Sequence, residues 1–221
     1  MVSTTFALML QSIGIENFLT FVIAATIFVL TPGLDTIFIL NKSIAQGKRA
    51  GIYATMGINT GVLVHTVFAA LGLSLIVAKS VLAFTVLKYF GAAYLLYLGV
   101  TKIISKENFL AMQAPQKNNK TSKQNFISGV INNVLNPKVA LFVLAFFPQF
   151  IKREYISSPV PFIFLGITYA ILGLTWLLIL TLFASLFSEK LSKSKKANTW
   201  LNRCSGITFI LMGVKVALSK R

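Results

Sequence analysis

The chain has 221 residues, of which 56% are apolar and 12% are charged, and its formal net charge is +16. Soluble globular domains are about 25% charged, so this composition excludes an ordinary soluble protein and indicates a chain embedded in a membrane. The basic residues lie between apolar segments and are not gathered on one face, which argues against a nucleic-acid-binding protein.

Six nearly charge-free stretches, each long enough to cross a bilayer as a helix, account for most of the chain. They cover residues 18–40, 51–78, 82–104, 126–151, 159–187 and 200–218. We therefore predict an all-α integral membrane protein with six transmembrane helices, which form a single membrane domain over residues 1–221.

The connections between these predicted helices differ in basic charge. With the helix-end residues Lys88, Lys102 and Arg203 counted in the adjoining connections, the first, third and fifth connections hold 3, 5 and 5 lysine or arginine residues, the second and fourth hold 2 each, and the segment before the first helix holds none. Cytoplasmic loops carry the excess of these residues. The odd-numbered connections are therefore predicted to lie in the cytoplasm, and both termini outside it.

The first predicted helix, 18–40, is interrupted near its centre by Pro32, Gly33 and Asp35. Proline removes a helical hydrogen bond, and irregular backbone at membrane depth is tolerated where it packs in protein or lines a watery cavity. A carboxylate at a helix centre costs roughly 2.5–3.5 kcal/mol on insertion scales, so such residues usually serve a function. We predict a helix break at Pro32 and Gly33, with Asp35 binding substrate or a proton; a structural ion pair is the alternative.

The second predicted helix, 51–78, contributes Asn59 and His65 as candidate binding residues. Gly57, Gly61 and His65 are spaced four apart, which puts the histidine on the face of a close-packing motif. His65 is therefore interpreted either as a packing residue at a helix interface or as a proton relay. Asn59 either hydrogen-bonds a solute or packs against a neighbouring helix.

The fourth predicted helix, 126–151, contains the second interruption. Pro137 predicts a break, and Lys138 is the one basic residue near the middle of a span. Asn132 and Asn136 are four residues apart and are expected to share a helix face. We predict that Asn132, Asn136 and Lys138 bind substrate, with a zwitterion between Asp35 and Lys138; helix packing is the alternative for the asparagines.

The two halves of the chain share features in the same order. The matched features are Pro32 with Pro137, Gly-Ile at 57–58 with Gly-Ile at 166–167, and GAAYLLYLGV at 91–100 with SGITFILMGV at 205–214. Repeats with an odd number of spans enter the membrane from opposite sides, as in many secondary transporters. We predict two inverted three-helix repeats with interrupted helices 1 and 4: repeat one at about 17–104, a basic cytoplasmic loop at about 105–124, and repeat two at about 125–218.

Three stretches carry a resemblance to a known family: TPGLDTIFILNKSIAQGKRAGIYATMGINTGVLVHTVFAALGL (31–73), FGAAYLLYLGVTKI (90–103) and NPKVALFVLAFFPQF (136–150). They resemble the LysE/RhtB transporters, the family of lysine exporters and homoserine/threonine efflux proteins. The resemblance implies a multi-pass protein of the bacterial cytoplasmic (inner) membrane that exports amino acids and is powered by the proton gradient. The family's first motif is usually PGPD, and Leu34 stands here in place of the second proline. The family's functional positions fall on Asp35, Asn136, Pro137 and Lys138, and also on Asn59 and His65.

No hydrolytic triad, phosphate-binding loop or metal-ligand cluster is found in the sequence, and the single cysteine, Cys204, excludes a disulfide within the chain. We therefore predict a protein that is not an enzyme, needs no cofactor and holds no metal. Its predicted function is secondary active export of amino acids or closely related metabolites, with the substrate and the lipid bilayer as partners and no nucleic acid. The alternatives are a metal-cation exporter and a channel or non-transporting scaffold, and both a monomer and a homodimer remain open.

Overall fold

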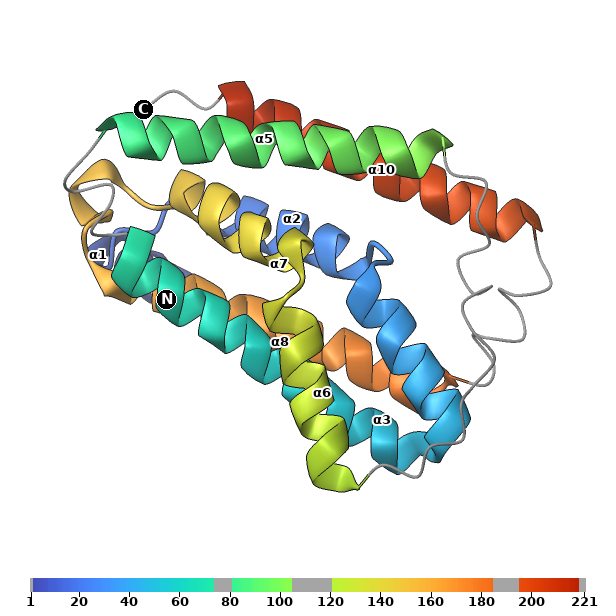
Figure 1. The fold of residues 1–221 in the computed structure, drawn as a ribbon. Helices are drawn as coiled ribbons and strands as arrows, with labels where there is room; N and C mark the ends of the chain where they lie inside the picture. The colour runs from blue at the N-terminus through green and yellow to red at the C-terminus, as the bar shows by residue number, and fades with distance from the viewer. Residues whose placement is uncertain (1, 74–80, 105–120, 185–194, 219–221) are drawn as a thin grey trace.

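The computed structural model describes residues 2–73, 81–104, 121–184 and 195–218, and Figure 1 shows that these ranges are mostly helical. Within them, the strand-like structure is one isolated bridge between Ile15 and Ile151. Two helices are long and apolar enough to cross a membrane, Leu34–Gly72 and Pro159–Leu182, and a bent pair of helices over 122–150 is a third candidate span. The prediction of an all-α chain with membrane-spanning helices is confirmed at this level.

The described residues form helices of very different lengths. The helices are α1 (Val2–Ser12), α2 (Phe18–Leu30), α3 (Leu34–Phe68), α5 (Val81–Ile104), α6 (Ser122–Val134), α7 (Pro137–Leu141), α8 (Pro159–Leu182) and α10 (Lys195–Leu218). The shorter π and 3-10 segments are Ala69–Leu73, Phe142–Phe146, Phe147–Phe150 and Arg153–Tyr155. Of the predicted basic loop at about 105–124, residues 105–120 lie outside the described residues.

Helix α3 is a hairpin of two arms, 34–46 and 48–68, because the backbone of Gly47 is not helical. Its φ of 82° and ψ of 171° lie in a region that is essentially restricted to glycine. Figure 1 shows the chain reversing direction here, so the first arm continues the first predicted helix and the second arm forms the second. The first predicted helix ended at 40 and the second began at 51. The helical arms extend beyond these limits and include Lys42, Lys48 and Arg49.

The second arm of α3 packs closely against α6. A Cβ atom on Gly57 would lie 2.0 Å from the carbonyl oxygen of Phe126, and one on Gly129 would lie 2.3 Å from that of Ala54. Small residues allow membrane helices to approach this closely, and dispersion contacts then replace the hydrophobic effect as the source of stability. The glycine spacing noted in the sequence therefore serves the contact between α3 and α6.

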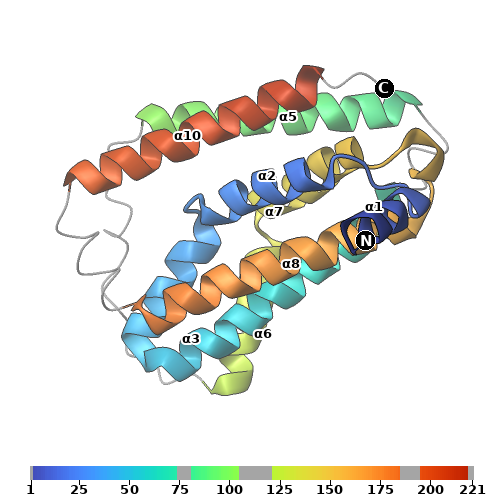
Figure 2. The ribbon, with the colours of Figure 1, turned by 180° about the vertical axis from the view of Figure 1, so that it is seen from behind.

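Helices α5 and α10 form an antiparallel pair through a second glycine contact. A Cβ on Gly99 would lie 2.7 Å from the carbonyl oxygen of Gly206, and one on Gly206 would lie 2.6 Å from that of Gly99. In Figures 1 and 2, α2 and α7 lie between this pair and the layer that contains α3 and α8. The matched segments 91–100 and 205–214 are thus direct neighbours in the fold.

Buried phenylalanines pack α2 against the π and 3-10 segments that follow α7. Phe28 stacks on Phe142 with ring centroids 3.9 Å apart, and Phe21 meets Phe147 and Phe150 edge to face at 5.4 and 5.3 Å. Such aromatic pairs add about 0.5–1.5 kcal/mol each beyond the burial of their area. This cluster joins α2 of the first interrupted helix to the segment 142–150 of the second.

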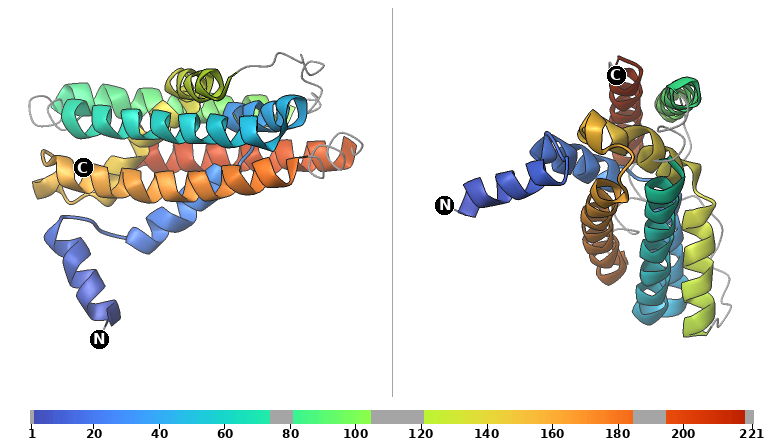
Figure 3. Two further views of the ribbon diagram at one scale, coloured as in Figure 1. Left: turned by 90° about the horizontal axis from the view of Figure 1, so that it is seen from below. Right: turned by 90° about the vertical axis from the view of Figure 1, so that its left-hand side faces the viewer.

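Helix α1 was not predicted, since its 11 residues are too short for a span. Figure 3 shows it projecting away from the other helices at the N-terminal end of the chain. Its side chains Phe6, Leu8 and Met9 are exposed. Short apolar helices of this kind suit the boundary between lipid and water.

Candidate functional site

Two interrupted helices meet at the centre of the molecule. Helix α2 ends at Leu30 and α3 begins at Leu34, so Pro32 and Gly33 lie in the first break. Helix α6 ends at Val134 and α7 begins at Pro137, with a bend of 52° between the two parts. Each break exposes the carbonyl end of one short helix and the amide end of the next.

Asp35 binds across to the second break. The side-chain amide of Asn132 donates to Oδ1 of Asp35 at 2.8 Å, and that of Asn133 donates to Oδ2 at 2.9 Å. Both asparagines lie in the last turn of α6, where the helix dipole would otherwise repel a carboxylate. The two amides therefore turn a repulsive helix end into a binding site for the Asp35 carboxylate.

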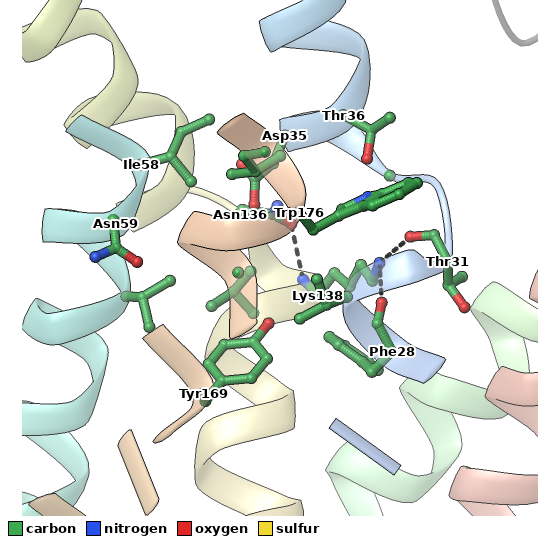
Figure 4. A pocket seen from close by; sticks show the side chains of 16 residues that line it. Phe28, Thr31, Asp35, Thr36, Ile58, Asn59, Asn136, Lys138, Tyr169 and Trp176 are labelled. Atoms are coloured by element: carbon green, nitrogen blue, oxygen red, sulfur yellow. Dashed lines mark hydrogen bonds between the residues drawn. The ribbon is translucent and has the colours of Figure 1, made fainter. Parts of the chain in front are cut away.

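Lys138 binds across to the first break, as Figure 4 shows. Its ammonium nitrogen donates to the carbonyl oxygens of Thr31 at 2.8 Å and Phe28 at 3.2 Å. The same nitrogen lies 4.5 Å from the ring centroid of Phe28 and 5.2 Å from that of Phe209. The carbonyl end of a helix favours a cation, so the contact agrees with the dipole of α2.

The two charged residues occupy equivalent positions. Asp35 is the second residue of α3, Lys138 is the second residue of α7, and each contacts the end of the first half of the other broken helix. In the described part of the chain, the carboxylate and the ammonium are therefore held by separate sets of partners. The bonds cross between the halves of the sequence, as a two-fold arrangement would require.

A cavity lies between these breaks and α8. Its volume is about 40 Å³, enough to admit water. Its lining includes four of the predicted site residues and one glycine of the first break: Asp35, Asn59, Asn136, Lys138 and Gly33. Thr31, Thr36, Gly173 and apolar and aromatic side chains from α2, α3, α7 and α8 form the rest of the wall.

Asn136 has a different role from the one expected of a helix-face residue. It is the N-cap of α7, and its Oδ1 accepts a hydrogen bond from the backbone amide of Lys138 at 3.1 Å. Its expected shared face with Asn132 is not kept, because the helix is broken between the two residues. The Nδ2 of Asn136 is buried, and Figure 4 shows this side chain close to Asp35.

His65 and Asn59 lie on the second arm of α3, at different places relative to the cavity. Asn59 is part of the lining. His65 is buried, and its Nε2 lies 3.1 Å from the carbonyl oxygen of Asn133, at the break between α6 and α7. In this structure His65 therefore has the contact of a residue that supports the helix break.

Among the cavity-wall residues that were not predicted, Tyr169, Gly173 and Trp176 belong to α8. They are spaced four and three residues apart and thus share one face of the helix. This spacing was visible in the sequence and could have identified the face of α8 that lines the cavity. Phe209 on α10, beside Lys138, was also missed, since nothing in its local sequence distinguishes it from the other phenylalanines.

Comparison with known proteins gives a family and several relatives. The chain matches the model of the family described as LysE type translocator over residues 26–220. The uncharacterized membrane protein YrhP of Bacillus subtilis is 35% identical over 211 residues, covering 92% of this chain and 100% of that protein. The leucine efflux protein of Salmonella typhimurium is 28% identical over 209 residues, covering 95% of this chain and 98% of that protein. No solved structure gives a significant match.

Proposed function

Because the chain belongs to the LysE type translocator family, whose members are transporters and not enzymes, we propose that it is a secondary active exporter of amino acids or closely related metabolites, coupled to the proton gradient. The observation that carries the proposal is the pair of opposite charges, Asp35 and Lys138, at two helix breaks that border one cavity. The leucine efflux proteins among its relatives support an amino-acid substrate.

The proposed topology has six spans in one membrane domain over residues 1–221. The spans are α2 with the first arm of α3, the second arm of α3, α5, α6 with the segment 137–150, α8, and α10. The equivalent positions of Asp35 and Lys138, and their crossed contacts, support two inverted repeats over about 17–104 and 125–218. We place the protein in the bacterial cytoplasmic membrane with both termini outside the cytoplasm, following the distribution of lysine and arginine.

In the proposed mechanism, a zwitterionic substrate binds between the two breaks. Its ammonium group binds the Asp35 carboxylate and takes the place of the amides of Asn132 and Asn133, while its carboxylate faces the positive charge of Lys138. Asn59 and Asn136 supply polar groups along the cavity wall. Since one carboxylate cannot bind both a substrate ammonium and a proton, competition for Asp35 couples export to the proton gradient.

The test is counterflow in proteoliposomes that contain the purified protein. Vesicles are loaded with one unlabelled amino acid from a panel, and the entry of the same labelled amino acid is measured for the wild type and for Asp35→Asn. We expect saturable exchange of one or a few amino acids by the wild type. Export driven by an imposed proton gradient is measured in the same vesicles, and in Asp35→Asn it should fall about tenfold or more, since a hydrogen bond to a charged group is lost.

The control is Glu154→Gln, which removes an exposed carboxylate between the fourth and fifth proposed spans and should leave exchange unchanged. A channel would give flux that does not saturate, and a scaffold would give none. Gradient-driven export by Asp35→Asn at the wild-type rate would remove Asp35 from the mechanism.

A further inference from the structure

We infer that the break between α2 and α3 is a binding site for an alkylammonium ion, that the side chain of Lys138 occupies it as a tethered ligand, and that this occupation holds the two interrupted helices in a transport-competent arrangement. The inference rests on the proposed function for its transport readout. The cage is defined by the carbonyl oxygens of Phe28 and Thr31 and by the rings of Phe28 and Phe209.

Two backbone carbonyl oxygens at the end of α2 bind the Lys138 ammonium. In a continuous helix, the carbonyl of Phe28 would accept a hydrogen bond from the amide of residue 32, but Pro32 has no amide hydrogen. The Lys138 ammonium donates to this carbonyl at 3.2 Å and to that of Thr31 at 2.8 Å. The ammonium thus binds carbonyl oxygens that lack their helical donors at the break.

Two buried aromatic rings also belong to the cage. Phe28 and Phe209 are 1% and 2% exposed, and their ring centroids lie 4.5 and 5.2 Å from the ammonium nitrogen. Aromatic faces attract organic ammonium ions, most strongly when the cation is desolvated. Two carbonyl oxygens with two aromatic faces suit an ammonium on an apolar stem, whereas hard divalent cations need six or more oxygen ligands.

The aliphatic stem of Lys138 lies in a space beside a glycine. The side chain passes Gly33, where a Cβ would lie 3.2 Å from both Cδ and Nζ of Lys138. Lys138 therefore connects α7 to the end of α2 through its hydrogen bonds and to α10 through Phe209. Lys138 thus links α7 to both α2 and α10, so removal of its ammonium group should loosen the packing at both breaks.

The experiment is chemical rescue. Lys138→Ala deletes the part of the side chain that n-propylammonium reproduces, namely three carbons and the ammonium group. We expect Lys138→Ala to lower counterflow about tenfold or more, because charged hydrogen bonds are lost. Millimolar n-propylammonium should restore it several-fold, whereas n-propanol, which has the same shape without charge, should not. Counterflow is run without a pH gradient, since the neutral amine crosses membranes.

Binding is measured separately from transport through the melting temperature of the purified variant. n-Propylammonium should raise the melting temperature of Lys138→Ala, because a ligand that binds only the folded state stabilises it. It should not raise that of Lys138→Met, whose side chain fills the space without a charge. If Lys138→Ala is recovered folded only when n-propylammonium is present during purification, and not with n-propanol, the cage is also supported.

The matched control is Lys215→Ala on α10. Lys215 is exposed and its nitrogen lies 5.7 and 5.1 Å from the ring centroids of Phe146 and Phe150, so it shares the aromatic contact at a surface position. This variant should exchange at the wild-type rate and show no response to n-propylammonium.

Three results would overturn the inference: exchange by Lys138→Met at the wild-type rate, equal rescue by n-propanol, or no effect of n-propylammonium on either the transport or the melting temperature of Lys138→Ala. Absence of counterflow in the wild type would instead contradict the proposed function. The melting temperature would still decide whether the cage binds an alkylammonium ion.

Discussion

At the scale of single residues, Asp35 depends on two asparagines for its position. Each carboxylate oxygen accepts one side-chain amide, at 2.8 and 2.9 Å, from adjacent residues of α6. Gly61 leaves room for Asn133, since a Cβ on Gly61 would lie 2.7 Å from both Cβ and Oδ1 of Asn133. His65 binds the backbone carbonyl of Asn133. Gly61 and His65 of α3 thus both contact the asparagine that binds Asp35.

The variant Asn133→Leu tests this arrangement. It leaves Oδ2 of Asp35 without its donor, which costs about 1–3 kcal/mol. Because Asp35 is then no longer positioned to receive the substrate, we expect exchange to fall by roughly 5- to 150-fold. Counterflow and the melting temperature are both measured. The control Ser128→Ala, also on α6, removes a hydroxyl that bonds within its own helix and should change neither quantity. Wild-type exchange by Asn133→Leu would show that Asp35 does not need this amide.

At the scale of elements, the breaks and the hairpin in α3 differ in origin. Both breaks occur beside a proline, where the local sequence forces the helix to stop. The reversal at Gly47 has no proline and depends on a backbone conformation that side chains with a Cβ avoid. Since the first arm of α3 carries Asp35 and the second carries Asn59, the hairpin sets how these two residues face the cavity.

Gly47→Ala should therefore destabilise the protein through strain alone. A Cβ at this position would meet nothing within 4 Å, so no steric clash with neighbouring atoms contributes. We expect a loss of about 1–3 kcal/mol, seen as a lower melting temperature of the purified protein. Gly72→Ala is the control, because its Cβ also meets nothing within 4 Å and its φ is not in the left-handed region. Equal melting temperatures for the two variants would contradict this account of the hairpin.

At the scale of the whole molecule, the charged residues lie where the interrupted helices of the two halves meet. Helices α2 and α7 occupy the middle layer, with the α5–α10 pair on one side and α3 and α8 on the other (Figures 1 and 2). Phe209 of α10 and Tyr169 of α8 approach this middle layer from opposite sides. A shift of either outer layer would therefore alter the surroundings of Lys138 or of the cavity.

The proposed topology puts three spans between residues 48 and 154, so these positions should lie on opposite sides of the membrane. Lys48→Cys and Glu154→Cys, both exposed positions, are made separately in a Cys204→Ser background. In intact cells, a membrane-impermeant maleimide should label Glu154→Cys, and it should label Lys48→Cys only after permeabilisation. Labelling of both from the same side would rule out an odd number of spans between them and with it the inverted repeat.

The sequence by itself determined the features that depend on local chemistry. Long apolar stretches predicted an all-helical membrane protein, the motifs in 31–73 and 136–150 predicted its family, and Pro32 and Pro137 marked the two places where helices end. These predictions succeed because hydrophobicity and the missing amide of proline act within a few residues of where they occur.

Only the tertiary structure decided which groups meet. Asp35 and Lys138 were predicted to face each other through a substrate, and the structure shows each bound to the end of the other broken helix. The roles of Asn136 as an N-cap and of Phe209 beside Lys138 also appear only in the folded chain. The physical reason is that a buried charge takes whichever donors or acceptors packing brings within about 3 Å, and these come from residues roughly a hundred positions away.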